Sequence, residues 1–99
     1  MYILLVCSAG MSTSLIVSRM QDAAKKKDMD IRIEAHPVSH VEGYGKEADV
    51  ILLGPQVRYQ LKNVKQSFPD KPVEIINMQD YGMVNGEKIL STALNLLEK

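Results

Sequence analysis

The sequence predicts an α/β fold, a four-stranded parallel sheet in the order 2-1-3-4 with helices on both faces. Two observations predict it. Four short apolar or alternating segments read as strands, and the stretches between them carry apolar residues at helical spacing. Strands that alternate with helices are joined by right-handed crossovers, which make the sheet parallel and cover both of its faces. The 99 residues suffice for one core, so we expect a single domain over residues 1–99.

The first half of the chain contains two predicted strands with a helix between them. Residues 2–6 are a continuous apolar run, as expected of a parallel strand that is covered on both faces. Apolar residues then recur at helical spacing over residues 15–24, and the three lysines that follow suit a solvent-facing helix C-terminus. Residues 31–35 alternate strictly and predict a half-exposed edge strand. Residues 39–48 contain two glycines and predict a loop or a short broken helix.

The second half repeats this alternation. Residues 50–53 are a buried strand that a glycine and a proline end. Apolar residues at helical spacing over residues 57–64 predict a helix that stops near a second proline. Residues 72–76 predict the fourth strand, and the apolar pattern over residues 89–97 predicts a closing helix.

One edge of the predicted sheet collects the segments that leave the strands at their carboxyl ends. Ligand sites in parallel sheets lie outside these ends, near the switch in strand order. The loop that starts at Cys7 leaves the first strand there, and the segments that start near Pro37, Gly54 and Asn77 leave the other three. We expect residues 81–86 to form a rim segment of the site, a loop in which both glycines are turn residues.

Composition excludes several functional classes. Lys plus Arg and Asp plus Glu number 12 each, so the zero net charge predicts no general nucleic-acid or acidic-membrane surface. One cysteine forms no internal disulfide and none of the cysteine-based metal sites, and we expect neither a metal nor a cofactor. The N-terminal apolar run is too short for a signal peptide or a membrane span. A lone thiol indicates a reducing, cytoplasmic compartment, and we expect a monomer.

Cys7 stands between the first strand and the first helix, where a helix N-terminus offers backbone N–H groups without intrahelical partners. Such a terminus attracts anions, so it would favour a thiolate and hold a phosphoryl group attached to the sulfur. A buried structural cysteine before an ordinary helix cap is the competing interpretation. We favour the phosphate site because a glycine and three further hydroxyl residues cluster in the same turn. The predicted phosphate-binding residues are Ser8, Ala9, Gly10, Met11, Ser12, Thr13 and Ser14.

The segment from Cys7 to Leu15 resembles the phosphocysteine loop of the enzyme IIB components of the bacterial phosphoenolpyruvate-dependent sugar phosphotransferase system, lactose/cellobiose type. Residues 48–56, 72–74 and 81–86 resemble the cellobiose/chitobiose branch, so the likeness covers nearly the whole chain. The resemblance implies the same four-stranded sheet. It also implies a cytoplasmic phosphotransferase that reaches the membrane only transiently.

In that family, the cysteine accepts a phosphoryl group from a phosphohistidine of the IIA protein. It passes the group to a sugar that enters through the membrane-embedded IIC protein. The resemblance therefore implies that Cys7 carries a phosphocysteine intermediate, that backbone N–H groups from about Ser8 to Ser14 hold the phosphoryl oxygens, and that the sugar is a β-glucoside-type disaccharide such as cellobiose or chitobiose.

Two other functions are compatible with such a loop. A low-molecular-weight tyrosine phosphatase, whose loop and topology are similar, needs an arginine where this chain has Thr13, and the nearest arginine, Arg19, is expected to point away. Asp80 resembles the acid of that family, although an aspartate before a glycine is more often turn chemistry. An arsenate-reductase-type thiol chemistry is weaker because a second cysteine is missing. A regulatory phospho-receiver domain would share the fold and the loop.

Several further residues are expected at the rim of the site. Residues 56–59 follow the glycine–proline break at the end of the third strand, and Arg58 among them could hold phosphate or dock a partner. Met11 either locks into the core or belongs to an exposed apolar ring that docks partners, and Tyr81 belongs to the last rim segment. His36 and His40 lie near the end of the second strand and could tune Cys7, but a surface histidine usually has no such role.

Overall fold

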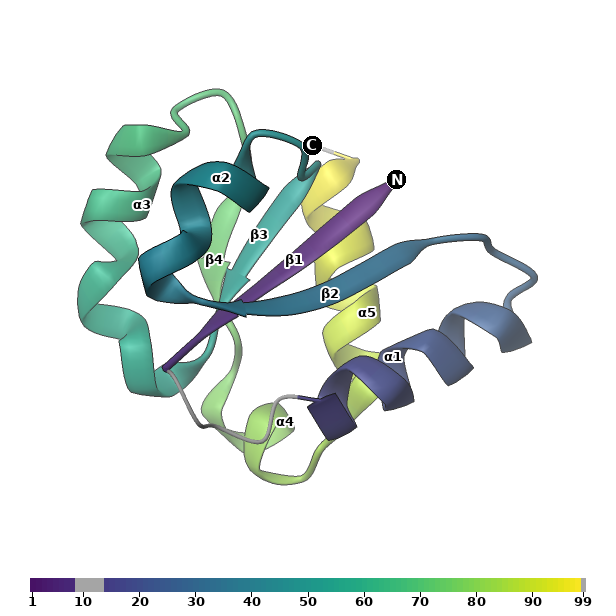
Figure 1. The fold of residues 1–99 in the computed structure, drawn as a ribbon. Helices are drawn as coiled ribbons and strands as arrows, with labels where there is room; N and C mark the ends of the chain where they lie inside the picture. Colours follow the sequence, from purple (N-terminus) through teal and green to yellow (C-terminus); the bar gives the residue numbers. More distant parts are fainter. Residues whose placement is uncertain (9–13, 99) are drawn as a thin grey trace.

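The structure is a computed structural model and describes residues 1–8 and 14–98. The described strands form one four-stranded sheet in the order β2-β1-β3-β4, and every neighbouring pair is parallel (Figure 1). This confirms the predicted architecture and strand order. The strands are β1 (Tyr2–Cys7), β2 (Arg32–Pro37), β3 (Val50–Leu53) and β4 (Val73–Ile75).

Helices fill the connections between the strands, and none in the described part of the chain is both long and apolar enough to cross a membrane. In Figure 1, α1 and α5 lie side by side, and α2 and α3 lie on the other side of the sheet, as expected for helices on both faces. The helices are α1 (Ser14–Lys26), α2 (Val41–Gly45), α3 (Leu61–Ser67), α4 (Met78–Gly82) and α5 (Gly86–Leu97), with 3₁₀ turns η1 (Val38–His40) and η2 (Pro55–Gln60).

The two central strands separate two hydrophobic cores. Alternate residues of a strand point to opposite faces, so β1 and β3 contribute to both. Leu5 and Leu52 pack with residues of α1 and α5, including the fully buried Met20 and Leu90. The other face is built from the intervening strand residues with η2, α2 and α3: Leu4, Val6, Ile51, Leu53, Val57 and Val64.

The structure of the second strand and of the segment that follows it agrees with the prediction from the sequence. Arg32 is exposed and Ile33 is buried, and the rest of β2 is half-buried, as an edge strand requires. The two-glycine stretch that follows forms the short η1 and α2, the broken helix that the sequence left as one of two outcomes. A Cβ on Gly45 would lie 2.4 Å from the ring of Phe68, so this glycine allows α2 to pack against the end of α3.

The predicted rim loop at residues 81–86 is wrong in its secondary structure. Gly82 is the last residue of α4, and Gly86 is the first residue of α5, so neither glycine is a turn residue. A Cβ on Gly86 would lie 2.5 Å from the backbone carbonyl carbon of Arg19, so glycine is required there by the close approach of α5 to α1. The short helix α4 lacks an apolar stripe long enough to be recognised in the sequence.

Candidate functional site

Cys7 is the last residue of β1 and lies at the carboxyl edge of the sheet. It pairs with Pro37 of β2, while the preceding Val6 pairs with Leu53 of β3. The cysteine is 6% exposed, and its Sγ donates a hydrogen bond of 3.7 Å to the carbonyl oxygen of His36. The single thiol of the chain is thus nearly covered and lies where parallel sheets place their ligand sites.

The predicted phosphate-binding loop is described only at its two ends. Ser8 is half-buried and directly follows Cys7, and Ser14 is exposed as the first residue of α1. The predictions for Ala9, Gly10, Met11, Ser12 and Thr13 fall outside the described residues.

Tyr81 of α4 is close enough to Cys7 to interact with it electrostatically. Burial, and then the negative charge of a Cys7 thiolate, raise the pKa of Tyr81 above its usual value, while a hydrogen bond with the Gln56 side chain lowers it. A Cβ on Gly54 would lie 3.5 Å from Tyr81 Cε2 and 3.1 Å from Gln56 Oε1. The Gly54 N–H in turn donates a 2.8 Å hydrogen bond to the carbonyl oxygen of Val6. The structure therefore brings Tyr81 and Gln56 together beside the ends of β1 and β3.

The ends of α4 fix the position of Tyr81. The Asn77 side chain caps the helix and accepts hydrogen bonds from the N–H groups two and three residues further on, at 2.9 and 3.1 Å. At the other end, the Val84 N–H donates to the Tyr81 carbonyl and the Asn85 N–H donates to the Asp80 carbonyl, which is a Schellman motif. Val84 occupies the left-handed position of that motif with φ of 52°, where glycine is usual.

Asp80 faces a different environment from Tyr81. It is 8% exposed and lines a small cavity under α4. Three of its neighbours in that cavity belong to the hydrophobic core on the α1/α5 face of the sheet. The cavity is lined by Leu52, Ile76, Asn77, Asp80, Ile89 and Thr92, and Cys7 is absent from this set. The geometry favours a structural aspartate over the phosphatase-type acid.

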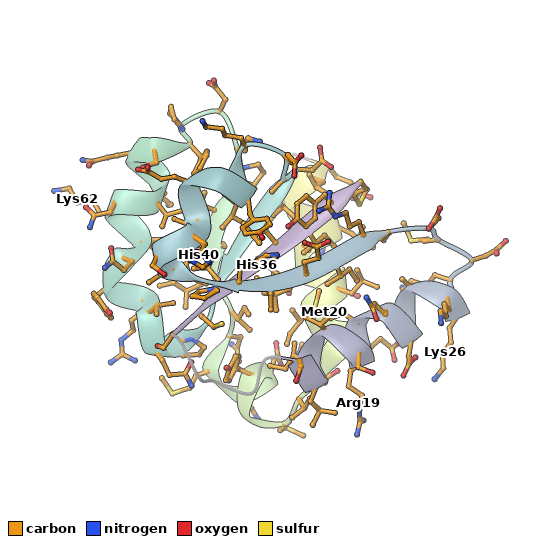
Figure 2. The ribbon with its side chains drawn as sticks, in the orientation of Figure 1. Arg19, Met20, Lys26, His36, His40 and Lys62 are labelled. Carbon is orange, nitrogen blue, oxygen red and sulfur yellow. The ribbon has the colours of Figure 1, made fainter. Side chains whose placement is uncertain are left out.

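The two histidines differ in what they contact. His36 stacks on Tyr44, with ring centroids 3.5 Å apart, and its Nε2 lies 2.9 Å from Glu34 Oε1. Its contact with Cys7 is made by the backbone carbonyl rather than by the ring. His40 is exposed at the end of η1, and Figure 2 shows both histidines on the β2 and α2 side of the molecule.

Glu34 is the centre of a polar network on β2. Arg32 Nε lies 2.7 Å from one carboxylate oxygen, and the Tyr2 hydroxyl donates a 3.1 Å hydrogen bond to the other. Hydrogen bonds from Arg32, and next from His36, lower the pKa of Glu34 from 4.5 to about 2. Burial, with the hydrogen bond to Glu34, raises the pKa of Tyr2 to about 12. This network ties the edge strand to β1.

The two arginines considered as phosphate ligands are both exposed. Arg58 lies on η2. Arg19 projects from α1 (Figure 2) and lines a groove of about 420 Å³ between α1 and the start of α5. The other charged residues of that groove are Asp22, Lys26 and Glu87. Arg19 thus projects outward from α1, in agreement with the expectation that it points away from the site.

Four large apolar side chains are exposed on helices that begin at the carboxyl edge of the sheet. Their exposed fractions range from 46% to 71%, well above those of core residues. They are Leu15 of α1, Tyr59 of η2, Met78 of α4 and Met83 at the end of α4.

Sequence reasoning names Cys7 and Tyr81 and places Gln56 at this edge without giving it a role. The role of Gln56 depends on Tyr81, which lies on another element, so no local pattern reveals it. The glycine–proline break that precedes Gln56 is the one signal that marks its position. The contact of Cys7 with the His36 carbonyl cannot be predicted from the sequence, because every residue carries a backbone carbonyl.

Comparisons with known proteins agree on one family. The model of the lactose/cellobiose-specific IIB subunit of the phosphotransferase system matches residues 2–92. The galactose-specific and cellobiose-specific EIIB components of Lactococcus lactis are each 44% identical to this chain, over 96% of it and 94% of their own length. The solution structure of the cellobiose-specific IIB component of Borrelia burgdorferi is also 44% identical. It superimposes with a TM-score of 0.83 over 99% of this chain and 92% of its own.

Proposed function

Because this chain belongs to the lactose/cellobiose-specific IIB family of the phosphotransferase system, we propose that it carries a phosphoryl group on Cys7 between two partners. The donor is a phosphohistidine of a IIA protein, and the acceptor is a sugar bound to a membrane IIC protein. The observation that carries the proposal is the place of the chain's only cysteine, at the carboxyl end of a central strand and directly before the loop that leads to α1.

In the first transfer, the Cys7 thiolate attacks the phosphorus of the phosphohistidine. A sulfur–phosphorus bond forms, the nitrogen–phosphorus bond breaks, and its electron pair returns to the imidazole. The thiol proton leaves before the attack, and in the resting protein it is donated to the His36 carbonyl. We propose that backbone N–H groups from Ser8 to Ser14 hold the phosphoryl oxygens, helped by the N-terminus of the thirteen-residue α1.

In the second transfer, a sugar hydroxyl attacks the phosphorus of phosphocysteine. The new oxygen–phosphorus bond forms as the sulfur–phosphorus bond breaks, and the thiolate of Cys7 is regenerated. The hydroxyl proton passes to a base on the partner or to water. Both steps are governed by positioning and charge stabilisation, since the phosphoryl group itself supplies the reactive centre.

The sugar is proposed as a β-glucoside-type disaccharide of the cellobiose class. Relatives named for galactose and for cellobiose are equally identical to this chain, so overall identity does not rank these sugars. Uptake assays with candidate β-glucosides in cells that carry the matching IIC protein would identify it. Transport of cellobiose or chitobiose is expected, and uptake confined to galactosides would contradict this assignment.

The exposed apolar residues around the carboxyl edge support docking of partners there. Leu15, Tyr59 and Met78 lie on three different helices that begin at the edge where β1 ends. Exposed apolar side chains that gather around a site are a common feature of protein interfaces. Arg58, exposed on η2 beside Tyr59, is proposed to take part in the same contacts. Met11 is also proposed as a docking residue, on the basis of the sequence alone.

The test is transfer of labelled phosphate from phosphorylated IIA protein to this chain. We expect one labelled residue, Cys7, in the mapped peptide, and we expect Cys7→Ser to abolish labelling because a hydroxyl is a far weaker nucleophile than a thiolate. Folding of the variant is checked by its circular dichroism and unfolding midpoint. Label on His36 or His40 would overturn the proposal.

A further inference from the structure

We propose that the Tyr81 hydroxyl, oriented by Gln56, donates a hydrogen bond to the anionic group at Cys7: the thiolate before transfer and the phosphoryl group after it. This inference rests on the proposed function for its phosphoryl half. It adds a side-chain donor to the backbone donors of the loop, and the donor comes from the far end of the chain, on α4.

The first support is position. The edge of the Tyr81 ring lies beside Gly54, because a Cβ there would be 3.5 Å from Cε2, the carbon next to the one that bears the hydroxyl. Gly54 is bonded through its N–H to the Val6 carbonyl, and Val6 immediately precedes Cys7. The hydroxyl end of the ring therefore lies at the ends of β1 and β3. An electrostatic interaction between Tyr81 and Cys7 accords with this position.

The second support is the direction of the hydrogen bond with Gln56. That bond lowers the pKa of Tyr81, as expected when the Gln56 amide N–H donates to the tyrosine oxygen. Gln56 Oε1 would lie 3.1 Å from a Cβ on Gly54. A phenol oxygen that accepts from an amide still has its own proton to donate. In the proposed contact, that proton is directed to the group at Cys7.

The third support is the protonation state and rigidity of the tyrosine. Burial and the nearby Cys7 raise the pKa of Tyr81, so the hydroxyl keeps its proton at neutral pH and remains a donor. The Asn77 cap and the Schellman motif fix both ends of α4. The ring itself packs against the core on the α1/α5 face, so little conformational freedom is lost when the hydrogen bond forms.

The closest test compares Tyr81→Phe with the wild type in the transfer equilibrium with IIA protein. Loss of a hydrogen bond to a charged group should move that equilibrium about tenfold toward phosphorylated IIA. Gln56→Met, a change at an exposed position, should move it in the same direction by a smaller factor. Tyr2→Phe is the matched control, because it removes a tyrosine hydroxyl that bonds Glu34 at the opposite end of β1 from Cys7, and it should leave the equilibrium unchanged.

A second readout separates a hydrogen bond from a general structural effect. In the phosphorus NMR spectrum of the phosphorylated protein, the pH midpoint of the phosphocysteine signal should rise in Tyr81→Phe, since a donor to the dianion is gone. A folded Tyr81→Phe protein with an unchanged midpoint would overturn the inference, even if its transfer were slower.

A third readout needs no partner. At a fixed pH near neutrality, alkylation of unphosphorylated Cys7 by iodoacetamide should slow by several-fold in Tyr81→Phe and stay the same in Tyr2→Phe. If the wild type accepts no phosphate from IIA protein but this alkylation effect is present, the proposed carrier function fails and the Tyr81 contact stands. If the wild type is phosphorylated and alkylation is unchanged in Tyr81→Phe, the carrier function stands and the contact fails.

Discussion

Asp80 and Tyr81 are neighbours in the chain but lie in different environments. Asp80 lines a small cavity against the core, whereas Tyr81 interacts electrostatically with Cys7, at the edge where β1 ends. A phosphatase would use an aspartate of this segment to protonate the leaving group, and an arginine of the loop to stabilise the transition state. Thr13 stands at the position of that arginine. These two differences favour the proposed phosphoryl carrier over a phosphatase.

From this difference we expect negligible turnover of an aryl phosphate by the wild-type protein. The rate of p-nitrophenol release should match that of Cys7→Ser, since Thr13 stands in place of the arginine clamp and Asp80 lies against the core. A sustained hydrolysis that requires Cys7 would instead place the chain with the phosphatases.

The residues of the site differ in how far the sequence predicts them. Cys7 is predicted because its residue type is rare and its position follows an apolar strand. Gln56 carries no comparable signal, because it is an exposed residue of a common type. Its proposed role depends on its hydrogen bond with Tyr81, which lies 25 positions away in the sequence and is brought beside it by the fold. The ring of His36, a candidate from its residue type, is paired with Glu34 and stacked on Tyr44 instead.

At the scale of elements, the contact between α1 and α5 depends on one glycine. We expect Gly86→Ala to lower the free energy of unfolding by about 1–3 kcal/mol, because the new Cβ would meet the backbone of α1 at Arg19 and Met20, which cannot move aside as a side chain can. Urea unfolding measures the change.

Gly43→Ala is the matched control for that experiment. Nothing lies within 4 Å of a Cβ on Gly43, which is in the middle of α2, so alanine should raise the free energy of unfolding by about 0.5–1 kcal/mol. Equal effects of the two changes would contradict the close approach of the helices.

The elements that the sequence predicts best are those with long apolar patterns. The strands and the helices α1 and α5 follow from periodicity, and their bounds differ from the predicted ones by a few residues. The helix α4 is missed because it has only five residues. In addition, Met78 at its start and Met83 directly after it are exposed, so they form no apolar pattern that marks a helix. Its strongest signal is Asn77, whose side chain caps it, but an asparagine before a short polar stretch predicts a turn equally well.

At the scale of the whole molecule, the network around Glu34 connects the edge strand with its surroundings. Glu34 bonds Tyr2 of β1 and pairs with His36, which stacks on Tyr44 of α2, while Arg32 lies 3.8 Å from Glu47 after α2. An edge strand has only one neighbouring strand in the sheet, so these side-chain contacts supply part of what holds β2 in place.

The charge of Glu34 should therefore set part of the acid stability. Its pKa falls from 4.5 to about 2 in the folded protein, so its contribution is fully present above pH 4.5 and is lost as the pH falls toward 2. Glu34→Gln should flatten the dependence of the unfolding midpoint on pH in that range. Glu42→Gln, at an exposed position of α2, should keep the wild-type slope. A Glu34→Gln protein with the wild-type slope would show that the network does not contribute.

The position of Cys7 also limits the kinetics of the proposed transfer. In the part of the chain that the structure describes, a strand lies on each side of β1 and helices cover both faces, so these elements leave the carboxyl edge as the approach to the sulfur. If the proposed donor and acceptor both use this approach, we expect them to bind this chain in turn rather than together. Each complex has to dissociate before the next one forms, so long residence times would slow the flux. We therefore expect both partners to form weak, rapidly exchanging complexes with this chain.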